Sequence, residues 1–171
     1  MVDDTIFQKL LDVGFRLVSF RPRSKKEFVD ALQTACKKRH IEDVSIIDTV
    51  LTRLTELGYV DDEKFTKWWI DQRNQFRLKG WRALSFELQQ KGIDRNLIQM
   101  IHQELESNDA SQEEINATAL VQKALVKFQN VSFKEQKMKL YSYLQRRGFE
   151  SSVISRVVDA MGKKGYNTST S

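Results

Sequence analysis

Apolar residues recur every three or four positions along most of the chain, which is the spacing of one face of an α-helix. These stretches lie at 28–35, 47–57, 65–76, 97–105, 120–128 and 153–161. No stretch alternates apolar and polar residues as a half-buried strand does. One proline and seven glycines are also too few to punctuate many short strands. The pattern therefore predicts an all-α fold.

Capping signals support this interpretation. Three serines are each followed three residues later by a glutamate, the spacing of a capping box at a helix start. These pairs are Ser24 and Glu27, Ser111 and Glu114, and Ser132 and Glu135. Asp61 and Asp62 begin another helix, in which Phe65 is the first apolar residue. Gly58, Gly92, Gly148 and Gly162 follow periodic stretches, where a left-handed residue ends a helix.

An internal repeat organises the chain. The segment from Leu88 to Asp94, with Gly92 at its centre, recurs 56 residues later as Leu144 to Glu150, with Gly148. A looser copy runs from Glu27-Phe28 through Leu32 to Ile41-Glu42, and because it lacks the glycine we expect its turn to be built differently. Each copy places apolar residues five apart around an acidic residue, as in a hydrophobic staple. The expected staples are Ile41 with Ile46 around Glu42, Ile93 with Ile98 around Asp94, Phe149 with Ile154 around Glu150, and Val60 with Phe65 around Asp61.

The repeat predicts a tandem array of three three-helix, helix-turn-helix-like units that is elongated and curved. We expect an N-terminal helix at 1–20, repeats at 21–79, 80–130 and 131–162, and a flexible tail at 163–171.

Composition excludes several classes of function. A single cysteine, Cys36, and two histidines leave no disulfide framework and no zinc-ligand set, so Cys36 is interpreted as a buried thiol and His40 as a surface imidazole. No nucleophile has a nearby base and no phosphate-binding loop occurs, so we expect no catalytic residue, cofactor or metal. The acidic N-terminus and the lack of an apolar run of about 18 residues predict a cytoplasmic protein without a membrane span.

The net charge of +5 and pI of 9.3 favour a polyanionic partner. Charge is distributed in blocks, basic at 21–40, 67–95 and 116–171 and acidic at 41–66 and 96–115. Such blocks are compatible with basic patches on stacked units, and equally with solvated helix faces.

Several motifs resemble, in order and spacing, the RecX family of regulators of the RecA recombinase. They are Arg21-Pro-Arg23-Ser24-Lys-Lys-Glu27-Phe28, Leu57-Gly58-Tyr59-Val60-Asp61-Asp62-Glu-Lys-Phe65, and Gly80-Trp-Arg82 with Phe86-Glu87-Leu88-Gln-Gln-Lys91-Gly92-Ile93. The resemblance covers about residues 14 to 160, and it departs from the family pattern at Phe28 and at the basic turn Lys37-Lys38-Arg39. It implies a non-enzymatic protein that lies in the groove of the RecA filament on DNA and inhibits ATP hydrolysis, strand exchange and co-protease activity.

The candidate partner-binding residues are basic. Guanidinium groups form paired hydrogen bonds with carboxylates or phosphates, and lysine side chains attract these anionic groups as point charges. They are Arg21, Arg23, Lys25, Lys26, Arg73, Arg82, Lys91, Arg95, Arg146 and Arg147. The expected structural positions are Ser24, Glu27, Gly58, Asp61, Asp62, Phe65, Gly80, Glu87, Leu88, Gly92, Leu144 and Gly148.

Alternatives remain open from the sequence. Solubility alone explains about half of the basic residues, and direct DNA binding is the second hypothesis, with the acidic blocks limiting it to weak contact. Trp68 and Trp69 are adjacent on a helix, so they are either both core residues or one of them faces a junction or partner. We expect the RecA filament as partner and a monomeric chain.

Overall fold

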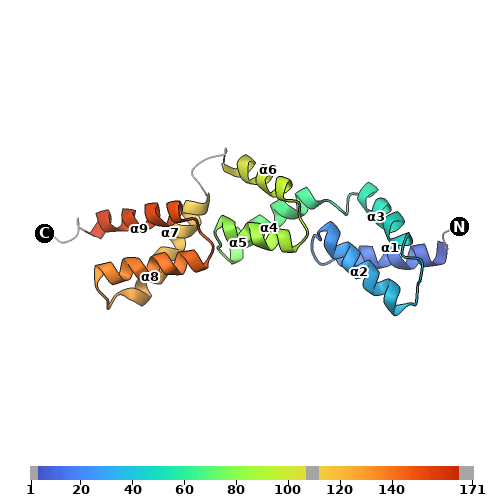
Figure 1. Ribbon diagram of the computed structural model, residues 1–171, viewed down its shortest axis with the longest axis horizontal. Helices are drawn as coiled ribbons and strands as arrows, with labels where there is room; N and C mark the ends of the chain where they lie inside the picture. Colours follow the sequence, from blue (N-terminus) through green and yellow to red (C-terminus); the bar gives the residue numbers. More distant parts are fainter. Residues whose placement is uncertain (1–3, 107–111, 166–171) are drawn as a thin grey trace. The chain divides into compact units, whose positions relative to one another are not determined.

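The computed structural model describes residues 4–106 and 112–165, with side chains to residue 161, and all regular elements in these ranges are helical (Figure 1). The predicted all-α class is confirmed. The elements are α1 (Asp4–Val18), α2 (Lys25–Lys38), α3 (Ile46–Glu56), α4 (Asp62–Phe76), α5 (Trp81–Gln90), α6 (Arg95–Glu106), α7 (Gln112–Leu125), the 3-10 turn η1 (Val126–Phe128), α8 (Phe133–Arg146) and α9 (Ser151–Gly165). The predicted cap Ser111 and residues 166–171 of the predicted tail lie outside the described residues.

The chain divides into two compact units. Unit 1 comprises Met1–Trp69 with Leu88–Ile98, and unit 2 comprises Ile70–Glu87 with Gln99–Ser171. In unit 1 the apolar faces of α1, α2 and α3 form one core around fully buried residues such as Leu10, Phe28 and Leu54. Cys36 belongs to this core, whereas His40 is exposed, as predicted. Burial raises the pKa of the Cys36 thiol, which therefore stays protonated.

In unit 2 the helices α7, α8 and α9 form a second core. Leu140, Leu144 and Phe149 are almost completely buried there together with Ile154. Most residues of the apolar stripes read from the sequence are thus buried, as expected for helices that are marginal alone and gain stability by packing. Leu57, Phe76 and Leu105, at the ends of their stripes, are exposed instead.

The 56-residue repeat is also seen in the structure, where residues 56 positions apart are buried alike. Phe28, Leu84 and Leu140 are 56 residues apart and all are buried. Leu32, Leu88 and Leu144 have the same spacing, and each is completely buried. The sequence self-match therefore marks equivalent core positions on α2, α5 and α8.

Four helices end in the same kind of turn. In the two glycine copies, the amide of Ile93 donates to the carbonyl of Leu88 at 3.1 Å, and that of Phe149 to Leu144 at 3.2 Å. This bond and a left-handed residue just before its donor define a Schellman motif. Gly92 and Gly148 have φ values of 80° and 82°. Gly58, at φ 76°, ends α3 in the same way.

The first copy makes this turn without glycine. His40 adopts φ 55°, and the amide of Ile41 donates to the carbonyl of Cys36 at 3.1 Å. The turn has the same hydrogen bonding but carries the strain of a left-handed side chain. The acidic residue that follows is also different from the prediction. Glu42 is exposed, and Asp43 accepts hydrogen bonds from the amide and hydroxyl of Ser45 just before α3.

The predicted helix starts are confirmed where they are described. Ser24 and Glu27 form a complete capping box, and the Ser132 hydroxyl accepts from the amide of Glu135. The Asp61 carboxylate accepts from the amide of Lys64 at 2.9 Å. No helix in the described ranges is long and apolar enough to span a bilayer.

Candidate partner-binding surface

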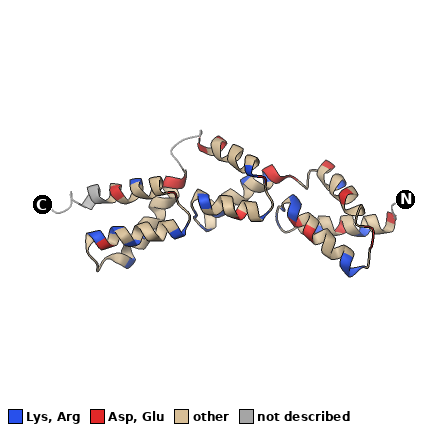
Figure 2. Cartoon of the chain, viewed as in Figure 1, with Lys and Arg blue, Asp and Glu red and all other residues tan. Residues whose placement is uncertain are grey.

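The basic residues predicted to bind a partner divide into paired and unpaired groups (Figure 2 shows Lys and Arg in blue on α2, α5 and α8). In unit 1, Glu27 lies between Arg21 and Lys91. Arg21 Nη2 is 2.8 Å from Glu27 Oε1 and its Nη1 is 3.2 Å from Oε2, while Lys91 Nζ is 2.8 Å from Oε1. These two cations therefore satisfy an internal carboxylate.

The electrostatics of Glu27 reflect this pairing. Partial burial raises its pKa, but hydrogen bonds from Arg21 and Lys91 outweigh burial and bring the pKa down to about 2.

Both cations also lie against tryptophans, with Arg21 Cζ 5.8 Å from the Trp68 ring and Lys91 Nζ 5.2 Å from the Trp69 ring. Both tryptophans are partly exposed, so neither is a fully buried core residue.

The same cluster holds the start of α2 against the turn between α5 and α6. The buried Ser24 hydroxyl donates to the Lys91 carbonyl at 2.7 Å. The amide of Lys25 donates to Asp62 at 2.7 Å. Gly92 is needed here for close approach as well as for its φ, since a Cβ at this position would lie 2.6 Å from Cβ of Lys26. These residues, singled out in the sequence, form one internal junction of unit 1.

The adjacent carboxylates Asp61 and Asp62 have structural roles. Hydrogen bonding from the Lys64 amide lowers the pKa of Asp61, and burial raises the pKa of Asp62, which accepts from Lys25. Each therefore serves a backbone amide, and no cluster of three or more potential metal ligands occurs in the described part of the chain.

Unit 2 contains a corresponding junction, between the start of α5 and the turn from α8 to α9. The amide of Gly80 donates to the Arg147 carbonyl at 3.0 Å, and the amide of Arg82 donates to the Gly148 carbonyl at 3.1 Å. A Cβ on Gly80 would lie only 2.2 Å from the Phe149 nitrogen. Backbone thus packs directly on backbone, which explains the glycine of the Gly80-Trp-Arg82 motif.

The two junctions are related by the same 56-residue offset. It equates Ser24 with Gly80 and Lys91 with Arg147, which are the residues in contact in each unit. It also equates Glu27 with Ala83. The unit 2 turn therefore has no carboxylate at the position that neutralises Lys91 in unit 1.

The arginines around this second turn are accordingly unpaired. Arg82 and Arg146 are exposed, and neither forms an ion pair with any described residue. Arg147 lies over the Tyr143 ring at 5.2 Å and donates to the Leu78 carbonyl at 3.4 Å, contacts that leave its charge uncompensated. Arg95, at the start of α6, is also exposed.

The other candidates are held within their own unit. Arg73 Nε is 2.8 Å from Glu87, which also pairs with Lys79. Lys26 pairs with Asp30 one helical turn away, and Arg23 Nε donates to the Leu17 carbonyl. Lys25 is exposed.

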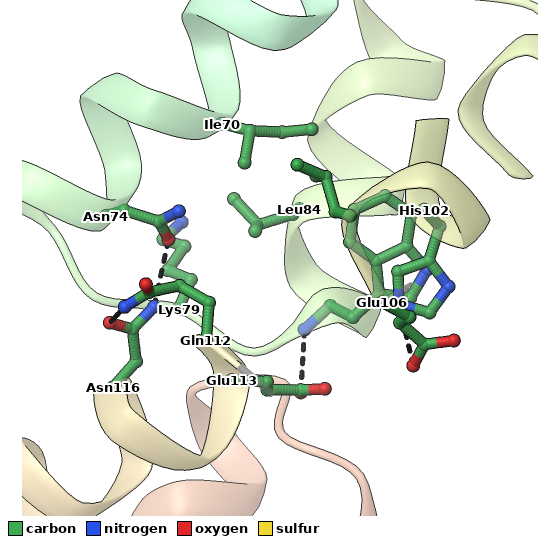
Figure 3. Close-up of a pocket in the computed structure, with 11 residues that line it drawn as sticks. Ile70, Asn74, Lys79, Leu84, His102, Glu106, Gln112, Glu113 and Asn116 are labelled. Carbon is green, nitrogen blue, oxygen red and sulfur yellow. Dashed lines mark hydrogen bonds and ion pairs between the residues drawn. The ribbon is translucent and has the colours of Figure 1, made fainter. Parts of the chain in front are cut away.

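A small pocket in unit 2 was not anticipated from the sequence (Figure 3). Trp81 stacks on His102 with ring centroids 3.9 Å apart, and the Trp81 amide donates to Glu113, whose pKa burial raises. On the other side, the buried Asn116 donates to Asn74 at 2.9 Å. Glu113, Asn74 and Asn116 are thus engaged in hydrogen bonds within the unit, and His102 Nε2 lies 3.5 Å from Glu106 Oε1.

Comparison with known proteins decides the family. A model of the third three-helix domain of RecX matches residues 112–158, and a model of the second matches residues 61–107. The regulatory protein RecX of Chlorobium phaeobacteroides is 32% identical over 91% of this chain and 95% of its own length. The chain belongs to the RecX family. RecX of Thermobifida fusca is 30% identical over 91% of this chain and 80% of its own length.

Solved RecX structures show the same fold. The crystal structure of RecX from Lactobacillus salivarius superposes with a TM-score of 0.80 at 18% identity, covering 94% of this chain and 99% of that one. A second crystal structure of a regulatory protein RecX has a TM-score of 0.73 at 20% identity and covers 90% of this chain and 73% of that one. The three-helix domains of RecX matched here combine α4 with α5 and α6, and α7 with α8 and α9.

Proposed function

We propose that this RecX-family chain is a non-enzymatic regulator that binds the RecA filament on DNA and inhibits its ATPase, strand-exchange and co-protease activities. The observation that carries the proposal is the family match over 91% of the chain, with relatives named regulatory proteins. Because this partner acts on DNA, the proposed site of action is the cytoplasm, and the proposed form is a monomer whose helical repeats bind in the filament groove.

The unpaired arginines support this proposal physically. Arg82, Arg146 and Arg147 surround one turn of unit 2 without a neutralising carboxylate. A guanidinium group is suited to forked hydrogen bonding with a partner's carboxylates. Arg21 and Lys91, already bound to Glu27, are removed from the proposed contact surface.

An ATPase titration tests the proposal. RecA assembled on single-stranded DNA hydrolyses ATP at a rate that we expect to fall as the purified chain is added, with inhibition at or below one chain per RecA subunit. The double variant Arg82→Gln with Arg146→Gln should require about tenfold more protein for the same inhibition. An unchanged ATPase rate at stoichiometric wild-type protein would reject the proposed function.

A charge-matched control separates the site from general charge. The double variant Lys37→Gln with Lys38→Gln also removes two positive charges, from the exposed end of α2. We expect it to inhibit within about twofold of the wild type. Equal loss in both double variants would mean that total charge, and not the unit 2 turn, governs binding.

Direct DNA binding is the second candidate function, favoured by the same unpaired arginines and the pI of 9.3. If it were primary, affinity for bare DNA would fall steeply as salt increases, because each neutralised phosphate releases counterions. We expect only weak binding to bare DNA at physiological salt. Tight, strongly salt-dependent retention there would make DNA the principal partner.

A further inference from the structure

Two phenylalanines are unusually exposed. Phe20 is 84% exposed and Phe76 is 74% exposed, the highest values among the large apolar side chains of the described residues. Single exposed apolar residues are common on protein surfaces and carry no inference by themselves. The position of these two in the repeat is the feature that distinguishes them.

Phe20 and Phe76 are exactly one repeat apart. The segment Phe20-Arg21-Pro22-Arg23-Ser24 corresponds to Phe76-Arg77-Leu78-Lys79-Gly80 at the 56-residue offset that also equates the buried Phe28 and Leu84. One phenylalanine lies just after α1 and the other is the last residue of α4. An exposed aromatic ring thus recurs beside a basic residue at the same place in two successive repeats.

Each ring projects from a segment that is firmly held. Next to Phe20, Glu27 bridges Arg21 and Lys91 within unit 1. Next to Phe76, Glu87 bridges the two cations Arg73 and Lys79 within unit 2. A side chain presented from a fixed backbone loses little conformational entropy on binding, which favours its use as an anchor.

We propose that Phe20 and Phe76 are equivalent apolar anchors, each of which inserts into a pocket on a subunit of the RecA filament; the inference rests on the function proposed above. A filament presents identical pockets at regular intervals, so a repeated anchor fits it by multivalent binding. A base-stacking platform for single-stranded DNA needs uncompensated cations around the ring to hold phosphates. Here one glutamate near each ring holds two cations in ion pairs, Arg21 and Lys91 with Glu27 and Arg73 and Lys79 with Glu87, so these four cations are already engaged within the chain. This favours a protein pocket over nucleic acid.

The test compares alanine variants for binding to two probes. The full chain carrying Phe20→Ala, Phe76→Ala or both is titrated against RecA filaments assembled on an oligo-dT strand with a slowly hydrolysed ATP analogue, and separately against the bare strand. We expect about tenfold weaker filament binding for each single variant and about a hundredfold for the double variant. Binding to the bare strand should not change. Because both rings are exposed, thermal unfolding should match that of the wild type.

Phe86 provides the matched control. It is 61% exposed on α5, but the corresponding residue one repeat earlier is Asp30, so it has no aromatic counterpart. Phe86→Ala should bind filaments within about twofold of the wild type.

The outcomes separate this inference from the proposed function. If the wild type binds filaments and the double variant binds equally well, the anchors are refuted and the regulatory function stands. A parallel loss on the bare strand would identify the rings as base-stacking platforms, and a comparable loss for Phe86→Ala would indicate a diffuse apolar surface. If the wild type does not bind filaments, the proposed function fails and the anchors for that partner fail with it.

Discussion

The two junctions differ in how a similar turn is held by a preceding helix. In unit 1 a side chain, the Ser24 hydroxyl, reaches the Lys91 carbonyl, and Glu27 neutralises the Lys91 charge. In unit 2 the backbone of Gly80 reaches the Arg147 carbonyl directly, and Ala83 stands where the glutamate would be. The unit 1 junction thus pairs its lysine internally, whereas the unit 2 junction relies on close backbone packing and leaves Arg147 without an ion pair to any described residue.

The largest expected effect is the loss of close packing in unit 2. In Gly80→Ala the new Cβ would lie 2.2 Å from the Phe149 nitrogen and 2.3 Å from the Gly148 oxygen, both rigid backbone atoms. We expect a free energy of unfolding lower by about 3 kcal/mol, measured by urea unfolding followed by circular dichroism.

Gly58→Ala is the control for this prediction. Unlike Gly80, Gly58 has a positive φ, but a Cβ there would meet no atom within 4 Å. Its cost is therefore limited to backbone strain, about 1 kcal/mol. Equal destabilisation by the two substitutions would contradict the close approach at Gly80.

The second effect is the loss of the unit 1 carboxylate. Glu27→Gln leaves Arg21 and Lys91 without their counter-ion, and we expect a loss of about 2 kcal/mol, less than a fully buried pair because the cluster is partly solvated. Because the pKa of Glu27 in the folded state is lowered to about 2, the stabilisation that this carboxylate provides depends on pH. The stabilisation is present above the unfolded pKa near 4.5 and is lost as the pH falls toward 2.

The pH dependence also checks the assignment. Wild-type stability should fall between about pH 5 and pH 2 more steeply than that of Glu27→Gln, in denaturant melts recorded across this range. Parallel curves for the two proteins would show that Glu27 is not the group responsible.

The sequence predicted the repeated elements well because they depend on local chemistry. Most of the apolar stripes, the turns at Gly58, Gly92 and Gly148 and the Ser24 capping box involve residues within a few positions of one another, and the structure contains each of them. The predicted helix end at Gly162 is wrong, because α9 continues to Gly165. The turn at His40 was expected to be built differently because it has no glycine, but it has the same hydrogen bond and the same left-handed conformation as the glycine turns.

The sequence did not show which basic residues are free. Arg21 and Lys91 were candidates for partner binding, but both pair with Glu27, which is six positions from Arg21 and 64 positions from Lys91. Only the fold brings Lys91 to this carboxylate. Glu42 was assigned a capping role, but it is exposed, and the residue before α3 that accepts hydrogen bonds, from Ser45, is Asp43. Phe76 was placed in the apolar stripe 65–76, but it is exposed, and the 56-residue offset that pairs it with Phe20 was the signal that set it apart.

The division into repeats at 21–79, 80–130 and 131–162 stays a prediction. The RecX domain models match 61–107 and 112–158 instead, because each domain begins with the helix that the sequence interpretation assigned to the end of the preceding repeat. The hydrophobic staple of Val60 and Phe65 has the same spacing whether the helix that follows it belongs to the preceding repeat or to the next one. The sequence pattern therefore does not fix the boundary between the repeats.

A third prediction concerns a variant that introduces into unit 2 the carboxylate that unit 1 has at the equivalent position. Ala83→Glu places a carboxylate where Glu27 stands one repeat earlier, within reach of the Arg147 turn. It should weaken inhibition of the RecA ATPase about fivefold, while thermal stability stays within about 0.5 kcal/mol of the wild type. Ala83→Gln has the same size without the charge and should inhibit almost normally. Equal loss with glutamine would point to a steric effect.

The smallest effects are expected at a pair of equivalent surface cations. Lys26 forms an exposed ion pair with Asp30 one turn along α2, whereas Arg82, its counterpart one repeat later, has no ion-pair partner among the residues that the structure describes. Lys26→Gln should therefore lower the free energy of unfolding by only about 0.3 kcal/mol, and less in high salt. Arg82→Gln should leave the free energy of unfolding unchanged and should instead weaken filament binding. The two substitutions therefore affect different measured quantities. If Arg82→Gln lowered stability as Lys26→Gln does, the arginine would have an internal role and the contrast between the two junctions would not hold.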